Sequence, residues 1–299
     1  MDYSKIFNNI NIRNCNVKIN EIMSKHTTFK IGGPADLFLE VNNIESLKKM
    51  LNLLKTNEIP FFLIGNGSNL LVDDSGYRGA ILNLKGEFEK VSVENNEIIC
   101  GAGTKLSKVC VEALGSSLSG LEFAYGIPGT LGGAIFMNAG AYGNEIKDVV
   151  ELVICMDSEG EIHKISNEDC GFGYRKSVFS ENKFVILYAK LRLNFGKYEE
   201  IKSKMDDLIS RRKMKQPLEY PSAGSYFKSP PGYHASALID QCGLRGFRIG
   251  DAAVSSKHAG FVINLGNASS EDVKKLQLEV ISQVASKTNV TLTPEALHI

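Results

Sequence analysis

The segment "GIPGTLGGAIFMNAGAYG", residues 126 to 143, places six glycines among apolar residues, with Thr130 and Asn138 as its small polar side chains. Glycine inside a regular element destabilises it by roughly 0.5–1 kcal/mol relative to alanine, so such a cluster indicates tight turns or a ligand against the main chain. Taken alone, the segment favours the simpler reading, a buried glycine-rich turn between two core elements. Any fold for this chain must accommodate this stretch of bare backbone.

A second glycine loop, "GNGSN" at residues 65 to 69, follows a predicted helix over 44–58 and the short apolar strand "FFLI". It is not a Rossmann fingerprint, because Leu70 stands near where a third glycine should fall and the following segment reads as strand. No segment fits the P-loop pattern either. A strand-exit loop with backbone amides free to point one way suits a pyrophosphate, and an ordinary polar turn is the alternative.

The remaining pattern predicts an α+β protein with a boundary near Gly196. "VSVENNEIIC" reads as a hairpin, "TKLSKVCVEALGSSL" as a helix, and "VVELVICM", "EIHKIS" and "KFVILYAKLRLN" as strands of a mixed or antiparallel sheet. After Gly196 come a charged amphipathic helix over 197–215, a turn-rich segment, a short helix and two strands. A last helix begins after Ser269 and Ser270.

Composition limits the classes of partner. The 34 basic and 34 acidic residues are interspersed, which argues against nucleic acid or an anionic membrane as a partner. No apolar run approaches the ~20 residues of a spanning helix, and the N-terminal segment lacks the apolar block of a signal peptide. The six cysteines form no C-x-x-C pair and the five histidines show no ligand spacing, so we expect reduced thiols, no metal and a cytoplasmic protein.

Seven sequence motifs, taken in their order along the chain, resemble those of a known protein family. They are "HTTFKIGGPADLF", "IGNGSNLLV", "AYGIPGTLGGAIFMNAGAYG", "GFGYRKSVF", "YPSAGSYFKSPPG", "IGDAAVSSKHAGFVIN" and "LTPEALHI". Together they closely resemble the UDP-N-acetylenolpyruvoylglucosamine reductase family from His26 onward. The spacing after "GFGYRKSVF" resembles the shorter branch of this family, which lacks an extra tyrosine-bearing loop.

The resemblance implies an α+β fold: a two-part FAD-binding fold of the vanillyl-alcohol-oxidase/PCMH type and a C-terminal α+β substrate-binding domain. We expect FAD-binding subdomains at 1–86 and 87–195 and the substrate domain at 196–299, with the last residues able to return to the FAD site. The residues that this resemblance assigns to FAD are Ile64, Gly65, Asn66, Gly67, Ser68, Asn69, Gly126, Pro128, Gly129, Thr130, Gly132, Gly133, Ala134, Asn138 and Gly140.

Histidines bear on how the cofactor is held. Many relatives of this fold attach flavin covalently through a histidine near the glycine loop, and residues 27 to 162 contain none. We therefore expect noncovalent FAD. For His26 two readings stay open, a hydrogen-bonded turn residue and a contact with the flavin.

The implied reaction is NADPH-dependent, FAD-mediated reduction of UDP-N-acetyl-enolpyruvoylglucosamine to UDP-N-acetylmuramate, in peptidoglycan precursor synthesis. Arg175 matches the arginine that binds the substrate carboxylate, Ser225 the serine that donates a proton, and Glu295 the catalytic glutamate. Without the resemblance, these would read as a surface ion-pair residue, a turn residue and a solvated carboxylate. Candidates for substrate binding, each of which could instead be an ordinary surface residue, are Tyr174, Arg212 and Lys228.

Two other functions remain open at this point. A flavin oxidase of the same fold, acting on an alcohol or lactone, would consume oxygen and need no NADPH. A non-catalytic nucleotide-binding module would leave Arg175, Ser225 and Glu295 without a joint purpose. We expect a monomer that binds the UDP sugar and NADPH.

Overall fold

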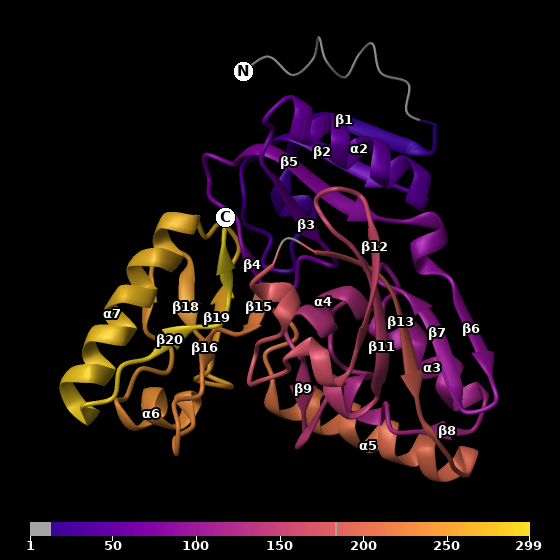
Figure 1. Cartoon of the computed structure of the whole chain (residues 1–299). Helices are drawn as coiled ribbons and strands as arrows, with labels where there is room; N and C mark the ends of the chain where they lie inside the picture. The colour runs from indigo at the N-terminus through magenta and orange to yellow at the C-terminus, as the bar shows by residue number, and fades with distance from the viewer. Residues whose placement is uncertain (1–12, 183) are drawn as a thin grey trace. The chain divides into compact units, whose positions relative to one another are not determined.

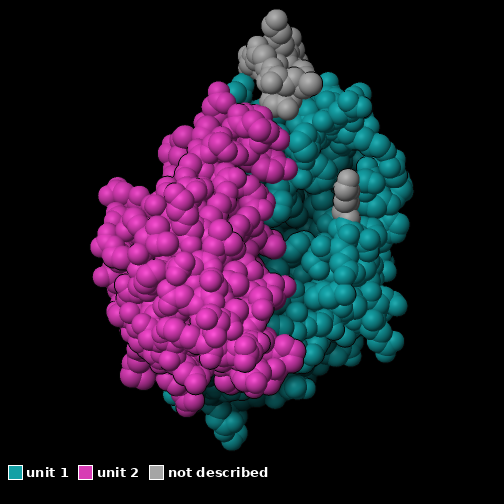
Figure 2. Space-filling model, turned by 90° about the vertical axis from the view of Figure 1, so that its left-hand side faces the viewer, with its two compact units in different colours: residues 1–19, 37–66, 79–210 teal, residues 20–36, 67–78, 211–299 magenta. Residues whose placement is uncertain are grey.

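The computed structural model describes residues 13–182 and 184–299, and the chain divides into two compact units (Figure 2). Unit 1 comprises residues up to 19, 37–66 and 79–210, and unit 2 comprises 20–36, 67–78 and 211–299. The boundaries fall inside strands β1 (Cys15–Ile22), β2 (Pro34–Val41) and β5 (Tyr77–Leu84), inside helix α5 (Tyr198–Lys215) and inside the loop 65–69. The expected division at 86/87 and 195/196 stays a prediction.

Unit 1 contains a five-stranded antiparallel sheet in the order β12-β11-β13-β7-β6 (Figure 1). Its strands are β6 (Val91–Glu94), β7 (Glu97–Gly101), β11 (Val150–Met156), β12 (Ile162–Ser166) and β13 (Val185–Arg192). The predicted hairpin is confirmed, since β6 and β7 pair antiparallel and Asn95 between them has φ 54°. Short pairs join β8 (Leu118–Ser119) with β14 (Asn194–Phe195), and β9 (Gly140–Ala141) with β10 (Asn144–Glu145).

A second sheet has the order β1-β2-β5-β3, in which β3 (Phe61–Ile64) runs parallel to β5. The predicted helix over 44–58 is confirmed as α2 (Ile44–Thr56), whose buried side chains Leu47, Met50, Leu51 and Leu54 recur at helical spacing. The Asn43 side chain caps α2 by accepting from the amide of Ser46. Because β3 follows α2 and leads directly into the loop 65–69, this loop leaves the sheet at a fixed strand end.

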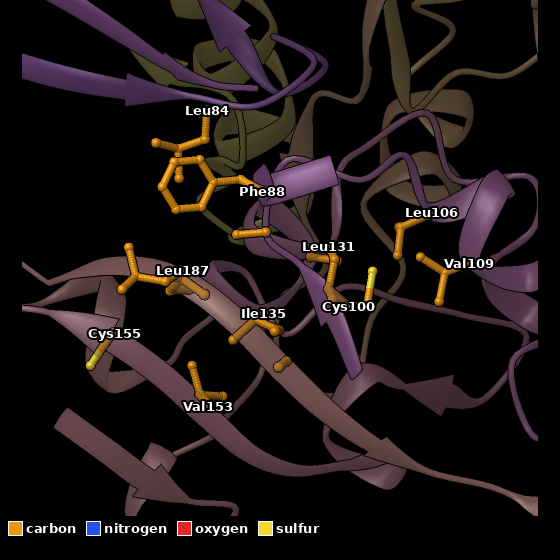
Figure 3. Close-up of a cluster of buried hydrophobic side chains, with 14 of the residues drawn as sticks. Leu84, Phe88, Cys100, Leu106, Val109, Leu131, Ile135, Val153, Cys155 and Leu187 are labelled. Atoms are coloured by element: carbon orange, nitrogen blue, oxygen red, sulfur yellow. The ribbon is translucent and has the colours of Figure 1, made fainter. Parts of the chain in front are cut away.

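One hydrophobic cluster fills unit 1 (Figure 3). Leu106 and Val109 of α3 (Leu106–Gly115) and Leu131 and Ile135 of α4 (Leu131–Phe136) contribute to it, together with side chains from β11 and β13. Burial of Leu131, Ala134 and Ile135 leaves Gly133 exposed on the other side of the short helix α4. The core therefore sets which part of the glycine-rich segment 126–143 can meet a ligand.

Unit 2 is built on the antiparallel sheet β15-β19-β18-β17, formed by β15 (Ser222–Ser225), β17 (Arg248–Ile249), β18 (Ala252–Val254) and β19 (Phe261–Asn264). Its core combines these strands with α6 (Ala235–Gln241) and α7 (Ser270–Thr288), as the left side of Figure 1 shows. Two short pairings complete it: β16 (Phe227–Lys228) with β20 (Thr293–Pro294), and β4 (Leu70–Leu71) with β21 (Leu297–His298). The predicted last helix is confirmed as α7.

The N-terminus of α7 fixes the loop that follows β4. Ser269 and Asp272 form a capping box at the start of this helix. The Asp74 carboxylate accepts hydrogen bonds from the amide of Ser270 at 2.9 and 3.0 Å and from its hydroxyl. A carboxylate at a helix N-terminus satisfies amides that have no partner within the helix, and so residues 73–74 are tied to α7.

Short 3₁₀ helices link the larger elements. They are η1 (Met23–Lys25), η2 (Gly86–Glu89), η3 (Glu122–Ala124), η4 (Ile146–Asp148), η5 (Glu168–Cys170) and η6 (Val178–Ser180). None of the helices in the described residues is both long enough and apolar enough to cross a bilayer.

The six cysteines are free thiols, and burial raises the pKa of Cys100 and Cys155 to about 11, which keeps both protonated at neutral pH.

Candidate active site

The two glycine loops meet inside unit 1, although more than fifty residues separate them in the sequence. The side-chain amide of Asn66 donates to the carbonyl oxygen of Pro128 at 2.8 Å. A Cβ placed on Gly65 would lie only 2.3 Å from Oγ1 of Thr130. Asn83 fixes the strand exit, since its Nδ2 donates to the carbonyls of Ile64 and Gly65. Gly65 can lie this close to Thr130 because it carries no side chain.

Part of the glycine-rich segment serves protein packing. A Cβ on Gly132 would lie 2.9 Å from Cβ of Ala102, and the Gly132 amide donates to the Ala102 carbonyl at 2.8 Å. Thr130 caps α4 by accepting from the amide of Gly133. Gly132 is therefore needed for packing against Ala102, and its assignment to FAD stays a prediction.

Other backbone in these loops fits a bound ligand. In the part of the chain that the structure describes, the backbone amides of Asn66 to Asn69 donate to no protein acceptor. Gly133 is exposed, and a Cβ built there would have Thr130 Oγ1 at 3.6 Å as its nearest neighbour. Amides without acceptors beside glycine backbone suit the phosphates of a dinucleotide such as FAD. The assignment of the residues of both loops to FAD, including Gly126, Gly129 and Ala134, stays a prediction.

Arg175 lies in a tight turn of unit 1 and has a positive φ of 55°. Gly173 and Lys176 exchange backbone hydrogen bonds around it, at 3.0 and 3.3 Å. Its guanidinium lies 5.0 Å from the centroid of the Tyr174 ring, with Nη2 3.5 Å from the carbonyl oxygen of Gly140. A left-handed conformation is unusual for arginine and is found mostly where the surroundings enforce it. Tyr174, predicted to bind substrate, is half-exposed and stacks on this guanidinium.

Ser225 and Glu295 come together in unit 2 through Tyr226. The amide of Glu295 donates to the Tyr226 carbonyl at 2.8 Å, and Ser225 immediately precedes Tyr226 at the end of β15. The adjoining pairing of β16 with β20 fixes this register, with Phe227 opposite Pro294. Arg175 belongs to the other unit, and its convergence with these two residues stays a prediction.

The chain's last residues run beside the end of the first glycine loop in unit 2. Asn69 Nδ2 donates to the Glu295 carbonyl at 3.1 Å, and the Leu297 amide donates to the Asn69 carbonyl at 2.9 Å. Gly67 and the segment around His26 also contact each other: a Cβ on Gly67 would lie 2.1 Å from the His26 carbonyl oxygen. Glu295 is therefore held by the same loop that the sequence assigns to FAD.

The other candidate residues have different surroundings. The His26 imidazole lies 2.9 Å from the Glu21 carboxylate, which supports the reading of a hydrogen-bonded turn residue. Lys228 lies in β16 opposite Thr293, and Arg212 lies in the last turn of α5. Roles for Arg212 and Lys228 in substrate binding stay predictions. Among the described residues, no three His, Cys, Asp or Glu side chains gather as a metal site would need.

Tyr226 also anchors the C-terminus through its buried ring. Its hydroxyl lies 2.9 Å from Nε2 of His298 and 3.0 Å from Oε1 of Gln277. Burial lowers the pKa of His298, the positive charge of Lys274 lowers it further, and Asp73 opposes both. A histidine with a lowered folded-state pKa takes up its proton more readily in the unfolded chain, so its protonation favours unfolding.

We therefore expect the free energy of unfolding to fall as the pH drops below about 6.5, the ordinary histidine pKa, towards the lower pKa of folded His298. The variant His298→Gln should lose less stability over this range, because its residue 298 takes up no proton. Urea denaturation at several pH values measures the difference. His234→Gln, at an exposed position in the same unit, is the control. A pH dependence in His298→Gln equal to that of the unchanged protein would contradict this expectation.

Comparison with known proteins places this chain in a family. A family model described as FAD binding domain matches residues 35–166, and one described as UDP-N-acetylenolpyruvoylglucosamine reductase, C-terminal domain, matches residues 216–299. The reductase of Clostridium novyi (strain NT) is 49% identical over 279 residues, which are 93% of this chain and 91% of that relative. The reductase of Caldanaerobacter subterraneus subsp. tengcongensis is 50% identical over 277 residues, again 93% of this chain and 91% of the relative.

A solved structure extends the comparison to the fold. The crystal structure of UDP-N-acetylenolpyruvylglucosamine reductase (MurB) from Thermus caldophilus matches with a TM-score of 0.81 and 37% identity, over 95% of this chain and 98% of that one. These matches confirm the expected fold class, an FAD-binding fold with a C-terminal α+β domain. The chain therefore belongs to the UDP-N-acetylenolpyruvoylglucosamine reductase family and is an FAD-dependent oxidoreductase.

Proposed function

We propose that this chain reduces UDP-N-acetyl-enolpyruvoylglucosamine to UDP-N-acetylmuramate, with NADPH as reductant and noncovalent FAD as cofactor, in peptidoglycan precursor synthesis. The observation that carries this proposal is the hydrogen bond from the Glu295 amide to the Tyr226 carbonyl. It joins the segments that bear the two proposed proton-handling residues, Ser225 and Glu295. A nucleotide-binding module would have no use for that arrangement.

The cofactor's part follows from the two glycine loops. When bound, FAD supplies the hydride chemistry of the reaction. The residues that we propose to hold it are Ile64, the loop 65–69 and, in the second segment, Gly126, Pro128, Gly129, Thr130, Gly132, Gly133, Ala134 and Gly140. The amides of Asn66 to Asn69, which have no protein acceptor among the described residues, are the donors that we assign to its phosphates.

The chain's own residues supply charge and a proton. Arg175 is proposed to bind the carboxylate of the enolpyruvyl group, because a planar guanidinium can form two parallel hydrogen bonds with a carboxylate. Glu295 is proposed to stabilise the enolic form of the substrate, and Ser225 to donate the proton that completes the reduction. Tyr174, Arg212 and Lys228 are proposed to contact other parts of the UDP sugar.

The wider assignments are proposals as well. We propose a cytoplasmic monomer in which residues 1–86 and 87–195 form the FAD-binding subdomains and residues 196–299 the substrate domain. The pairing of β21 with β4 supports a return of the last residues to the glycine loop. This pairing would bring Glu295, which belongs to the proposed substrate domain, next to a segment assigned to FAD.

A spectrum and a turnover assay test this function. The purified protein should absorb in the flavin region, and acid precipitation should release FAD into the supernatant. NADPH consumption should depend on the enolpyruvyl UDP sugar. Colour that stays with the precipitate would refute noncovalent attachment. Oxygen consumption with an alcohol or lactone, without any need for NADPH, would favour the oxidase instead.

A further inference from the structure

The turn that carries Arg175 is held from both sides by buried side chains. On one side, Nδ2 of Asn138 donates to the carbonyl oxygen of Gly173 at 2.9 Å. On the other side, the Ser177 hydroxyl donates to the carbonyl oxygen of Phe136 at 2.8 Å. Asn138 and Ser177 both have 0% exposure. The two bonds thus tie the residues flanking Arg175 to the C-terminal end of α4.

Asn138 also fixes the hairpin that the arginine reaches. Its Nδ2 donates to the Glu145 carboxylate at 3.1 Å, and its Oδ1 accepts from the Lys147 amide at 3.1 Å. Glu145 pairs with Gly140 across β9 and β10, and the Gly140 carbonyl oxygen is the atom near the Arg175 guanidinium. One side chain therefore contacts both the turn that carries Arg175 and the hairpin against which its guanidinium lies.

The conformation of Arg175 explains the need for such support. A non-glycine residue with a φ of 55° persists where surrounding structure enforces it, at a cost of order 1–3 kcal/mol. Asn138 itself has a φ of 42°, a conformation that asparagine tolerates better than most residues. Both N–H groups of its amide are used by protein acceptors, which leaves the side chain no donor for a ligand.

We propose that Asn138 and Ser177 form a bracket that positions Arg175 for the substrate carboxylate, and that the Asn138 side chain serves the arginine instead of contacting the cofactor. Asn138 is thus a positioning residue. The inference rests on the role of Arg175 in the proposed function. It assigns to an asparagine of the glycine-rich segment a task that its sequence context does not suggest.

The variant Asn138→Gly tests the bracket, because glycine keeps the positive φ and removes only the side-chain bonds. We expect kcat/KM for the enolpyruvyl UDP sugar to fall about 10- to 100-fold, since small displacements of a positioned group can cost on the order of 10²-fold. FAD content and the rate of flavin reduction by NADPH should stay unchanged. Asn95→Gly, at an exposed hairpin position with φ 54°, is the matched control and should change none of these.

A double-mutant cycle with Arg175→Ala separates positioning from general damage. If Asn138 acts through the arginine, Asn138→Gly should cost less than about twofold once Arg175 is gone. Equal losses in both backgrounds would overturn the bracket, and so would loss of FAD in Asn138→Gly. Ser177→Ala, which removes the opposite bond, should show the same dependence on Arg175 and decides the matter if Asn138→Gly does not fold. Normal turnover in Arg175→Ala would instead refute the role of Arg175 in the proposed function.

Discussion

A valine at position 65 should weaken FAD binding and lower the flavin content of the purified protein. The first side-chain atom would lie 2.3 Å from Oγ1 of Thr130, and valine adds two further carbons. Thr130 is poorly able to move away, because it caps α4 and its neighbours are hydrogen-bonded to the turn at Thr104 and Leu106. The loop that bears the free amides would have to shift instead.

Overpacking of this kind costs about 1–3 kcal/mol, which corresponds to a loss of FAD affinity of about 5- to 150-fold if the strain is relieved when the loop moves off its site. Flavin absorbance per protein, followed by titration with FAD, measures the loss. Gly115→Val is the control, because nothing lies within 4 Å of a Cβ at that exposed position of unit 1.

A second substitution shows whether the clash is the cause. In Gly65→Ala the added Cβ meets the same Thr130 hydroxyl, and replacing Thr130 by alanine in that background removes the obstacle. The double variant should recover part of the FAD affinity that Gly65→Ala loses, although α4 then lacks its cap. If Gly65→Val retained flavin like the unchanged protein, the loop 65–69 would have no part in holding FAD.

Local patterns in the sequence predicted most of the regular elements. The helices α2 and α5 start and end within about two residues of their predicted limits, because each has an apolar stripe at helical spacing and a change of pattern at its ends. The start of α7 also lies within two residues of its predicted position. The hairpin at Asn95 was also readable, since asparagine tolerates the positive φ that its turn requires. These features depend on neighbours in the sequence alone.

Long-range pairings could not be predicted in this way. The strands β4 and β21 are two residues each, and neither Leu70–Leu71 nor Leu297–His298 shows a periodicity that would indicate a partner more than two hundred residues away. The strand β1 was missed for a related reason, because its alternation of polar and apolar side chains leaves it largely without fully buried residues. Such elements form because tertiary contacts select them.

In the candidate site, too, some features follow from the local sequence and others depend on residues far away along the chain. Glycine clusters in the sequence pointed to the two loops. The sequence could not show that Gly65 lies against Thr130 or that Gly132 lies against Ala102, because these partners are distant along the chain. Likewise, the positive φ of Arg175 and the bonds of Asn138 depend on a turn 35 residues beyond that asparagine. A role assigned residue by residue from motifs omits such supporting contacts.

Replacing Ser225 by alanine should produce the largest and most selective loss of activity. In the described part of the chain the Ser225 hydroxyl makes no hydrogen bond with the protein, and the adjoining backbone is held by the bond from Glu295 to the Tyr226 carbonyl. Removing the hydroxyl therefore leaves the fold intact while it removes the proposed proton donor. NADPH should still bleach the flavin at close to the normal rate, because that half of the reaction needs no proton from Ser225.

Return of the flavin colour on anaerobic addition of the enolpyruvyl UDP sugar should instead slow by about 10²- to 10⁴-fold, the usual contribution of general-acid assistance. Stopped-flow absorbance follows the two halves separately. Ser225→Cys should recover part of the rate, since a thiol can donate a proton. Ser222→Ala, in the same strand β15, is the matched control. Equal slowing of both halves would indicate disturbed flavin geometry, and normal rates in both would leave Ser225 as an ordinary residue at the end of a strand, because a proton donor cannot be lost without slowing the step that consumes the proton.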